Sequence, residues 1–428
     1  MADLSDRASR RNAVLIALDY VGYGVGVTFL GMTTILPSLV RTLGGRPVVV
    51  GSLSAIMTGG WLLPQLFAGQ ALAHRAQVKG YVWIWAAISR AGLALFVPVL
   101  WLFAVQAPRL TLVALLVSLA VFSVGDALSS VGWFDLLAKA VPLEWRGRMM
   151  GAAQSTASLL GIGAGAVVQA ILAQPRPFPG NQVRLFLLGA ITCGLSLVFI
   201  GLVREPVGVA QELEQKRLSW GAYLPRLRAI VRTDARFVWL TVVRWLSGLA
   251  DMASAFYILY AADRLHLPMQ MSGLFISASV VGGLLSGVVL GPVADRRGSA
   301  FMINIVMLLH CACPPLALLA PFVAGFHPWV APGLFALIFG VMGMFMGAYM
   351  VGPMNYLLEI APAGERSLYV ALSNTLGGLQ VLSPLLAGWL LEVTSYEVLF
   401  LVTLGLGLLG LAVALRGPSG LARWLPGH

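Results

Sequence analysis

A succession of long apolar stretches constrains this chain more than any other feature of its sequence. A helix of about 20 apolar residues crosses the roughly 30 Å hydrocarbon core of a bilayer. Stretches of at least that length recur along nearly the whole chain, over residues 13–40, 48–72, 80–105, 111–141, 149–173, 183–203, 237–262, 269–292, 301–323, 331–360, 368–392 and 396–415. The sequence therefore predicts an all-α membrane protein with twelve transmembrane helices.

Composition agrees with a membrane protein and leaves no room for a soluble domain. Charged residues make up 11% of the chain, whereas a soluble globular protein carries about 25%. The net charge of +11 could suggest nucleic acid as a partner. However, we assign twenty of the 28 basic residues to one face of the membrane and six to the other. Basic residues gather on the cytoplasmic side of membrane proteins, so we expect both termini to be cytoplasmic and no nucleic acid to bind.

The two halves of the chain repeat each other. Glycines 51, 60 and 69 of the second stretch match glycines 273, 282 and 291 of the eighth, each 222 positions later. Residues 131–137 are echoed by residues 351–357 at an offset of 220. Duplicated six-helix halves with a site between them are a known transporter architecture. The sequence predicts an N-terminal bundle over 1–203, a cytoplasmic linker over 204–236 and a C-terminal bundle over 237–428.

A charged segment, Gly291-Pro-Val-Ala-Asp295-Arg296-Arg297-Gly298, separates the eighth and ninth apolar stretches. This pattern resembles the signature loop of major facilitator superfamily transporters, although Ser299 stands where the family has a basic residue. The equivalent loop of the first half carries Ala73 and His74 in place of the acid. The resemblance implies the twelve-helix fold of that family, with helices 1, 4, 7 and 10 lining a central cavity.

The same resemblance implies a cytoplasmic gate. An aspartate at a membrane face can cap a helix and accept hydrogen bonds from arginines. Asp295 would then lie near the start of helix 5, at Arg146, and Arg296 or Arg297 would reach Glu359 at the end of helix 10. Alternatively, the two arginines only fix the topology. The residues assigned to the gate are Gly291, Asp295, Arg296, Arg297, Gly298, Glu359, Arg146 and Arg366, the last being the repeat equivalent of Arg146.

Five ionisable residues stand out within the apolar stretches: Asp19, Arg90, Asp126, Arg244 and Asp251. Each costs at least about 2.5–3.5 kcal/mol on insertion scales, so each needs a physical reason. Helical spacing places Tyr23 with Asp19, Trp133 with Asp126, and Arg244 with Asp251, each pair on one helix face. These stripes either line a cavity for substrate and protons or form internal ion pairs that fix packing.

Arg90 and Asp126 fit the second alternative well, because both lie near the midplane of adjacent antiparallel helices. Asp251 lies two turns from Arg244, about 10 Å at 1.5 Å per residue, which is too far for direct contact. Burial without a nearby cation favours the protonated form of a carboxyl group. Asp251 is therefore the first candidate for proton coupling, and Asp19 the second.

The tenth apolar stretch carries methionines at four-residue spacing, at positions 342, 346, 350 and 354. Methionine is flexible and suits surfaces that accept varied apolar ligands, although ordinary helix packing explains the same pattern. We assign Met346, Met350 and Asn355 to the cavity and expect an amphipathic or lipophilic, drug-like solute. The resemblance to this family implies, for drug-efflux members, the antiporter signature Gly-x-x-x-Gly-Pro-x-x-Gly-Gly in helix 5. Here Gly161–Ala166 has the spacing of the first two glycines but lacks the proline.

These observations together predict an inner-membrane secondary transporter that works by alternating access and couples to protons. A facilitative uniporter, an uptake permease for a polar metabolite and a non-transporting sensor or scaffold remain alternatives. The five histidines are dispersed and no phosphate-binding loop is present, so we expect no enzyme, metal or cofactor. The three cysteines fall within apolar stretches and are interpreted as packing residues. We expect a monomer in the lipid bilayer whose partners are a small-molecule substrate and protons.

Overall fold

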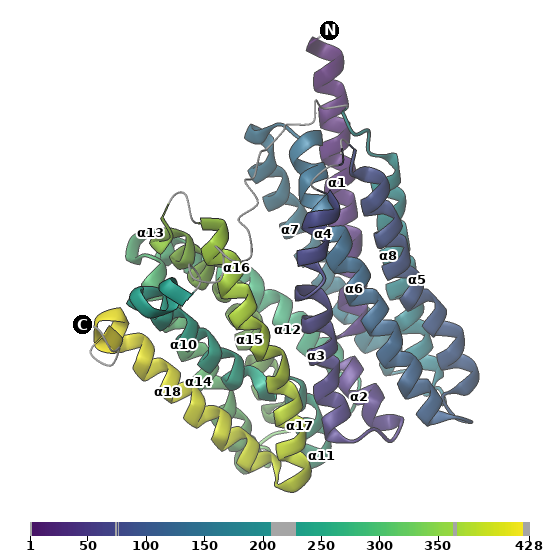
Figure 1. Ribbon diagram of the computed structural model, residues 1–428. Helices are drawn as coiled ribbons and strands as arrows, with labels where there is room; N and C mark the ends of the chain where they lie inside the picture. Colours follow the sequence, from purple (N-terminus) through teal and green to yellow (C-terminus); the bar gives the residue numbers. More distant parts are fainter. Residues whose placement is uncertain (1, 73–74, 76, 207–227, 363–365, 423–428) are drawn as a thin grey trace. The chain divides into compact units, whose positions relative to one another are not determined.

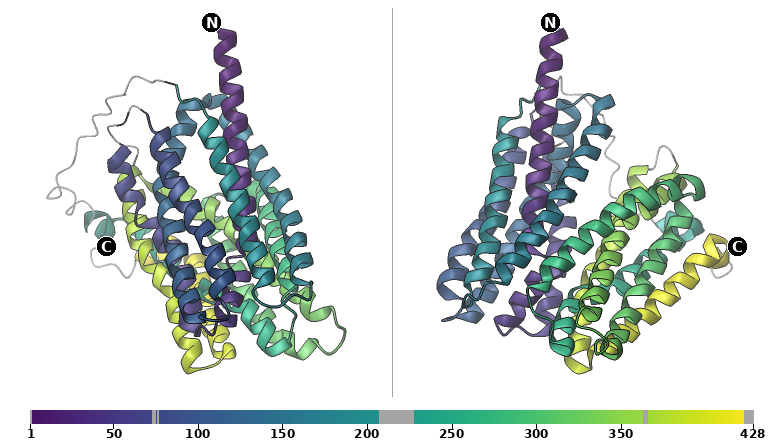
Figure 2. Two further views of the ribbon diagram at one scale, coloured as in Figure 1. Left: turned by 90° about the vertical axis from the view of Figure 1, so that its right-hand side faces the viewer. Right: turned by 180° about the vertical axis from the view of Figure 1, so that it is seen from behind.

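A computed structural model describes residues 2–72, 75, 77–206, 228–362 and 366–422 of the 428-residue chain. Regular secondary structure in these residues consists of helices only (Figures 1 and 2). Eleven of the described helices are long and apolar enough to cross a membrane, and a further apolar helix over Pro47–Leu62 is shorter. This confirms the prediction of an all-α membrane protein with about twelve spans.

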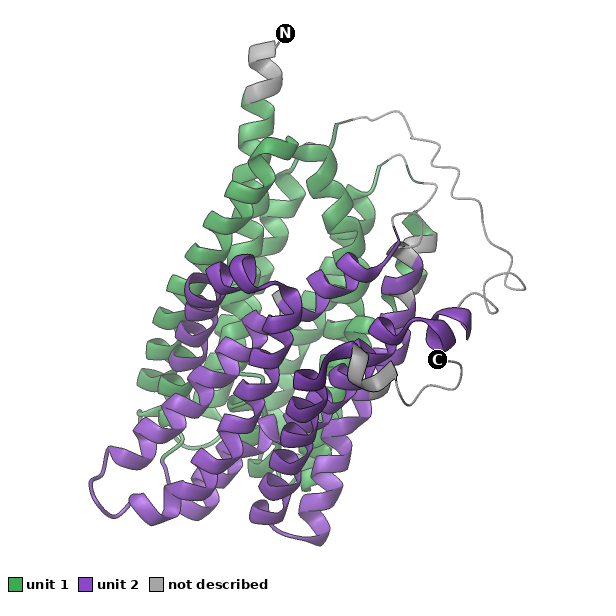
Figure 3. Cartoon of the chain, turned by 90° about the vertical axis from the view of Figure 1, so that its left-hand side faces the viewer, with its two compact units in different colours: residues 1–212, 268–277 green, residues 213–267, 278–428 purple. Residues whose placement is uncertain are grey.

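The chain divides into two compact units (Figure 3). The first comprises residues 1–212 and 268–277, and the second comprises residues 213–267 and 278–428. Most of the predicted linker, residues 207–227, lies outside the described residues. The helices of the first half are α1 (Ala2–Leu30), α2 (Ile35–Thr42), α3 (Pro47–Leu62), α4 (Gln65–Leu72), α5 (Lys79–Phe103), α6 (Pro108–Ala140), α7 (Leu143–Leu172) and α8 (Gly180–Leu202).

The second half begins with α10 (Ala235–Ala250), the 3₁₀ helix η1 (Asp251–Phe256) and α11 (Tyr257–Leu265). It continues with α12 (Met271–Leu285), the π-helical turn η2 (Ser286–Leu290), α13 (Gly291–Arg297), α14 (Ser299–Val323) and α15 (Val330–Ile360). The last helices are α16 (Arg366–Gly377), the 3₁₀ helix η3 (Gly378–Leu382), α17 (Ser383–Val393) and α18 (Tyr396–Ala422).

Five of the twelve predicted spans are interrupted rather than continuous. Gly31, with φ of 52°, separates α1 from α2, and Pro64 lies between α3 and α4. The seventh span changes from α-helix to 3₁₀ helix at Asp251, and the eighth and eleventh change at Ser286 and Gly378. Such changes often mark functional positions in a helix. The sequence analysis predicted these spans as single helices and did not anticipate the interruptions.

Helix packing within each unit follows the predicted repeat. In the first unit α5 packs along α6 and α1 packs along α8. In the second unit the equivalent helices do the same, because α14 packs along α15 and α10 packs along α18. The duplicated sequence therefore folds into two bundles with the same neighbours.

Glycines of the repeat allow two of these helices to approach closely. A Cβ atom at Gly60 of α3 would overlap the Ser123 side chain of α6. A Cβ atom at the matching Gly282 of α12 would overlap the backbone of Gly340 on α15. Small residues at such contacts let helix backbones pack directly against each other in membranes.

A pair of neighbouring glycines tests this packing. We expect Gly282→Ala to destabilise the protein by about 1–3 kcal/mol, the usual cost of overpacking. Gly283→Ala is the matched control, because its nearest neighbour would be the Gly343 carbonyl oxygen at 3.7 Å. Both changes bring the same gain in helix propensity. The thermal midpoints of the purified variants in detergent measure the difference, and equal midpoints would contradict the close contact.

Candidate functional site

The first unit contains a buried acid on α1. Asp19 is 3% exposed, and its Oδ2 atom accepts a 2.7 Å hydrogen bond from Nε1 of Trp133 on α6. Its other oxygen, Oδ1, is buried and accepts no hydrogen bond from the part of the chain that the structure describes. Ser196 of α8 lies beside it, but the Ser196 hydroxyl donates to the Cys193 carbonyl at 2.8 Å. Asp19 is therefore held by one donor and is only half satisfied.

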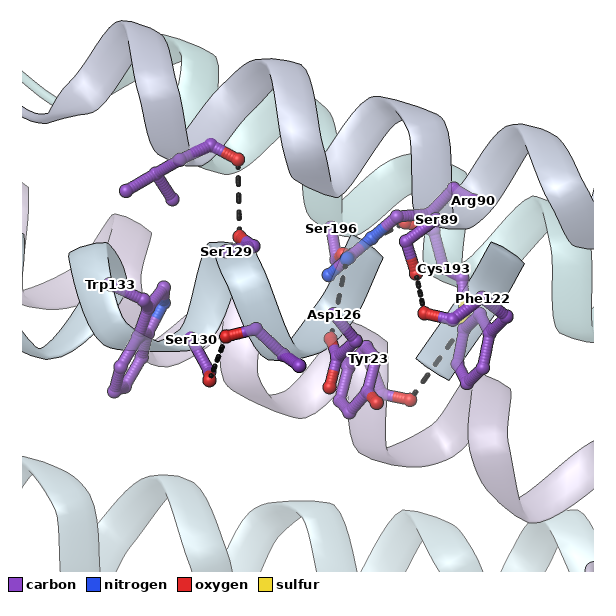
Figure 4. A network of polar contacts seen from close by, with 12 residues as sticks. Tyr23, Ser89, Arg90, Phe122, Asp126, Ser129, Ser130, Trp133, Cys193 and Ser196 are labelled. Carbon is purple, nitrogen blue, oxygen red and sulfur yellow. Dashed lines mark hydrogen bonds and ion pairs between the residues drawn. The ribbon is translucent and has the colours of Figure 1, made fainter. Parts of the chain in front are cut away.

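An ion pair close enough to interact electrostatically with Asp19 is formed by Arg90 and Asp126, which Figure 4 shows. Nη1 of Arg90 on α5 lies 3.6 Å from Oδ1 of Asp126 on α6, and the two side chains are 8% and 17% exposed. The guanidinium carbon of Arg90 also lies 5.0 Å from the centre of the Tyr23 ring on α1. Arg90 and Asp126 thus neutralise each other at the interface between two helices, as a structural pair would.

Arg90 is nevertheless incompletely satisfied. Its Nε and Nη1 atoms are buried and donate no hydrogen bond to any described residue. The cluster of Asp19, Arg90 and Asp126 has two acids and one base, so one negative charge is left over if all three are ionised. A buried excess charge of this kind is costly unless a proton or a cation compensates it.

The second unit contains a small, partly open cavity of about 10 Å³, which has room for about one water molecule. Its lining comes from the break in the seventh span, from α14 and from α15. The lining residues are Ala250, Asp251, Ser254, Tyr257, Leu309, His310, Cys313, Met342 and Phe345. The α-to-3₁₀ transition places Asp251 at the first position of η1, so that its carboxylate reaches this cavity.

Asp251, which is partly buried, differs from the other charges within the spans because no described residue donates a hydrogen bond to its carboxylate or forms an ion pair with it. The cationic residue on the same predicted stripe, Arg244, is engaged elsewhere. Arg244 Nε donates to the Tyr349 hydroxyl at 3.3 Å, and Nη1 donates to Ser373 Oγ. Arg244 does not line the cavity. Arg244 and Asp251, which we predicted to share one helix face, therefore lie in two different environments.

His310 of α14 is a second ionisable residue in the cavity, and the sequence analysis did not include it among the buried charges. The side chain is buried, with Nε2 2.9 Å from Ser247 Oγ and the ring centre 3.9 Å from that of Phe345. A signal was present, because histidine within a transmembrane stretch is as unusual as an acid. His310 is isolated in the sequence from other metal-ligand residues, so its spacing gave no indication of a site.

The described methionine side chains of the α15 stripe do not line the cavity together. Met342 lines the cavity, whereas Met346 and Met354 are 61% and 44% exposed. Asn355 is also exposed. The side chain of Met350 lies outside the described residues. Of the methionine side chains of this stripe that the structure describes, only Met342 lines the cavity.

The predicted gate segment is helical, since Gly291–Arg297 forms α13 and Gly298, with φ of 81°, ends it. Asp295, Arg296 and Arg297 are exposed. We expected Arg296 or Arg297 to contact Glu359, but in the described structure Glu359 Oε2 accepts a 2.5 Å hydrogen bond from Ser299 Oγ. Arg297 instead lies over the Phe301 ring at 5.2 Å.

The remaining residues assigned to the gate are Arg146 in the first half and Arg366 in the second. Arg146 donates to the carbonyls of Ala138 and Val141, at 2.6 and 2.9 Å, and so binds the last turn of α6. The side chain of Arg366 and residues 73–74 of the first signature copy lie outside the described residues. The contact between Asp295 and the start of helix 5 stays a prediction.

Glu205 is a further buried acid that the sequence analysis did not single out. Its carboxylate accepts hydrogen bonds from the backbone N–H groups of Val78, at 2.9 and 3.0 Å, and Lys79, at 2.9 Å. It also lies 3.6 Å from Lys139 Nζ, and its side chain is 3% exposed. Glu205 therefore caps the start of α5 and connects it to the end of α6.

The second half makes an equivalent connection with different residues. Ser299 and Glu359 lie 220 positions after Lys79 and Lys139, and they bond directly to each other. In both halves a carboxylate thus joins the start of one helix to the end of its neighbour. The acid comes from beyond α8 in the first half and from α15 itself in the second.

Comparisons with known proteins agree with this architecture. The family model described as Major Facilitator Superfamily matches residues 20–379 and 240–426. No curated protein sequence matches the chain. Similar solved structures include the nucleoside transporter NupG (14% identity, TM-score 0.66, covering 96% of this chain and 98% of that one). A bacterial homologue of the iron transporter ferroportin in an inward-facing state is 19% identical, with a TM-score of 0.67 and coverage of 96% and 99%. A D-xylose-proton symporter is 15% identical, with a TM-score of 0.63 and coverage of 100% and 98%.

The Arg90–Asp126 contact leads to a stability prediction. We expect Arg90→Ala to destabilise the protein by about 3–5 kcal/mol, because it leaves a buried carboxylate without its partner. Combining it with Asp126→Ala should recover much of that loss. Arg109→Ala, at an exposed position, is the control and should have little effect. Equilibrium unfolding in detergent gives these values, and losses that simply add in the double variant would rule out the pair.

The Glu205 contacts lead to a second stability prediction. Glu205→Ala removes a helix cap, so we expect a loss of about 0.5–2 kcal/mol. Glu144→Ala is the control, because Glu144 is an exposed acid in the first turn of α7. The two variants are compared by thermal unfolding in the same detergent. A loss of stability no greater for Glu205→Ala than for Glu144→Ala would exclude the capping role.

Proposed function

The chain belongs to the major facilitator superfamily and is a membrane transporter rather than an enzyme, and we propose that it couples solute movement to protons. In this proposal the two bundles alternate in exposing a site to either side of the inner membrane. The substrate is a small organic molecule with an apolar part. Both termini lie in the cytoplasm, as the distribution of basic residues suggests, and the working unit is a monomer.

The environment of the Asp251 carboxylate is the observation that most supports proton coupling. A carboxylate at the break of a transmembrane helix, facing a cavity without a cationic partner, is stable only when its charge is compensated. The other titratable side chains that line the cavity are Tyr257, His310 and Cys313. None of them carries a fixed positive charge. A proton is the simplest ligand that neutralises Asp251, and its release to the opposite side supplies the driving force.

Asp19 is the second candidate for the proton site. It shares the first unit with Arg90 and already accepts a hydrogen bond from Trp133, so part of the cost of its charge is offset. Asp126 has a cationic partner at 3.6 Å and is assigned a structural role. The ranking of the three acids therefore follows the partners that each one has.

Apolar side chains around Asp251 support an amphipathic substrate. The lining includes the apolar side chains of Leu309, Met342 and Phe345 and the polar side chains of Ser254, Tyr257 and His310. Binding sites for small molecules are usually apolar cavities with a few well-placed polar groups, and this cavity, at about 10 Å³, would have to widen during the transport cycle to hold a substrate. Among the compared structures, the D-xylose-proton symporter carries a proton-coupled substrate by its own description.

Transport in proteoliposomes tests the coupling. The compound that most raises the thermal midpoint in a screen of metabolites and drugs serves as the labelled substrate. We expect an imposed pH gradient to drive its accumulation by the wild type. Asp251→Asn should abolish that response, because the amide cannot release a proton, while exchange of labelled for unlabelled substrate continues.

Glu144→Gln is the matched acid-to-amide control at an exposed site and should transport as the wild type does. An Asp251→Asn variant that still responds fully to the pH gradient would remove Asp251 from the coupling mechanism. A wild type that equilibrates its substrate but never accumulates it would favour a facilitative uniporter instead.

A further inference from the structure

We propose that the first unit carries a site for one anionic phospholipid, in which Arg176 and Arg184 bind the headgroup phosphate and the exposed face of α8 holds an acyl chain. The site lies where α7 ends and α8 begins. This is the end of the bundle opposite to the start of α1, because Asn12 of α1 bonds the backbone of Arg204, just beyond the other end of α8. The inference goes beyond the proposed transport function and uses none of the residues assigned to it.

The two arginines converge on a single uncharged oxygen. Nε of Arg176 and Nη1 of Arg184 both donate to Oε1 of Gln174, at 3.1 and 2.6 Å. Two guanidinium groups on one acceptor lie side by side and repel each other. Neither forms an ion pair with a residue that the structure describes. A phosphate that bridges them offsets this repulsion, and the planar fork of arginine matches phosphate oxygens in paired hydrogen bonds.

Hydrogen bonds fix the backbone that carries the pair. The carbonyl oxygen of Gln174 accepts from the backbone N–H of Arg176 at 2.8 Å and from Nδ2 of Asn181 at 3.0 Å. Asn181 is 7% exposed and lies in the first turn of α8, the helix that also carries Arg184. The loop between the two helices is therefore attached to the bundle before a ligand arrives, which lowers the entropy cost of binding.

The surroundings of the pair favour a negatively charged ligand. Residues 31–47, 104–110 and 173–184 form this end of the first unit. They contain no aspartate or glutamate but five arginines: Arg41, Arg46, Arg109, Arg176 and Arg184. The predicted topology assigns these segments to the non-cytoplasmic face, where basic residues are ordinarily scarce. No acid in these segments competes with a ligand for the guanidinium groups.

An apolar face runs along α8 away from Arg184. Five of the large apolar side chains of this helix are between 45% and 56% exposed: Leu187, Ile191, Leu195, Val198 and Leu202. Steps of three and four residues from Arg184 place all of them on the same side of the helix as the arginine. A lipid whose phosphate lies at Arg184 can therefore extend a chain along this face and remove it from water. A free phosphate ion has no part that uses the apolar face, so the combination favours a lipid.

Native mass spectrometry of the purified full-length protein in detergent measures its affinity for single lipids. The probes are phosphatidylglycerol and phosphatidylcholine with the same palmitoyl and oleoyl chains, which share the phosphate and differ in net charge. We expect the wild type to bind phosphatidylglycerol at least about tenfold more tightly, because each arginine favours an anionic headgroup by about fivefold. Arg176→Gln combined with Arg184→Gln should bring the two affinities to within about twofold of each other.

Two further variants make the test specific. Arg46→Gln combined with Arg109→Gln is the matched control, because it removes two exposed positive charges from the same end of the bundle, and it should keep the preference for phosphatidylglycerol. Gln174→Glu leaves both arginines in place but gives them a carboxylate, which should occupy them and remove the preference. This variant decides the question if the double substitution of Arg176 and Arg184 does not fold.

Two soluble probes separate a lipid from a free anion: inorganic phosphate and glycerophosphoglycerol, the headgroup without its chains. Both should bind at least about tenfold more weakly than phosphatidylglycerol, because they lack the apolar contact with α8. Equal binding of the two lipids by the wild type, an equal loss of preference in the Arg46 and Arg109 control, or a preference kept in Gln174→Glu would overturn the proposal. Inorganic phosphate binding as tightly as phosphatidylglycerol would also overturn it. None of these measurements requires transport, so their outcome is independent of the proposed proton coupling.

Discussion

The cost of placing charge in a medium of low dielectric constant is the constraint on which this structure depends. Every ionisable side chain within a transmembrane helix must find a partner, a proton or a ligand. Arg90 and Asp126 form an ion pair, and Asp19 accepts a hydrogen bond from the Trp133 indole. Arg244 donates hydrogen bonds to two hydroxyl groups. Asp251 has neither an ion-pair partner nor a hydrogen-bond donor among the described residues. This gradation from paired to unpartnered is the basis on which we propose a structural role for Arg90 and Asp126 and a functional role for Asp251.

Breaks in the helices belong to the same account. Backbone groups at membrane depth must be hydrogen-bonded, so a helix is interrupted only where protein or a water-filled cavity surrounds it. The seventh span changes to 3₁₀ helix at Asp251, beside the cavity that this residue lines. In transporters, interrupted helices commonly surround the substrate site. The position of the break and the absence of a partner for the acid therefore point to the same place.

Much of the fold could be predicted from the sequence because its signals are strong and local. The lengths of the apolar stretches predicted the transmembrane helices. The matched glycines 60 and 282 indicated the repeat, and each of these two glycines lies at a close contact between helices. The site was harder to predict. His310 carries no periodic signal, and Glu205 lies after the last helix of its bundle, so its capping of α5 depends on tertiary contacts. In the described structure Glu359 accepts a hydrogen bond from Ser299, a contact that no sequence pattern indicated, and its contact with an arginine stays a prediction.

In the proposed coupling, Asp251 is the acid that gains and loses a proton. Infrared difference spectroscopy of the purified protein, between acidic and alkaline pH, measures this directly through the carbonyl stretching band of protonated carboxyl groups. We expect a band from a carboxyl group within the membrane that appears on acidification and that is absent in Asp251→Asn but retained in Asp126→Asn. A band unchanged in Asp251→Asn, and lost instead in Asp19→Asn, would contradict the account and transfer the proton to the first bundle.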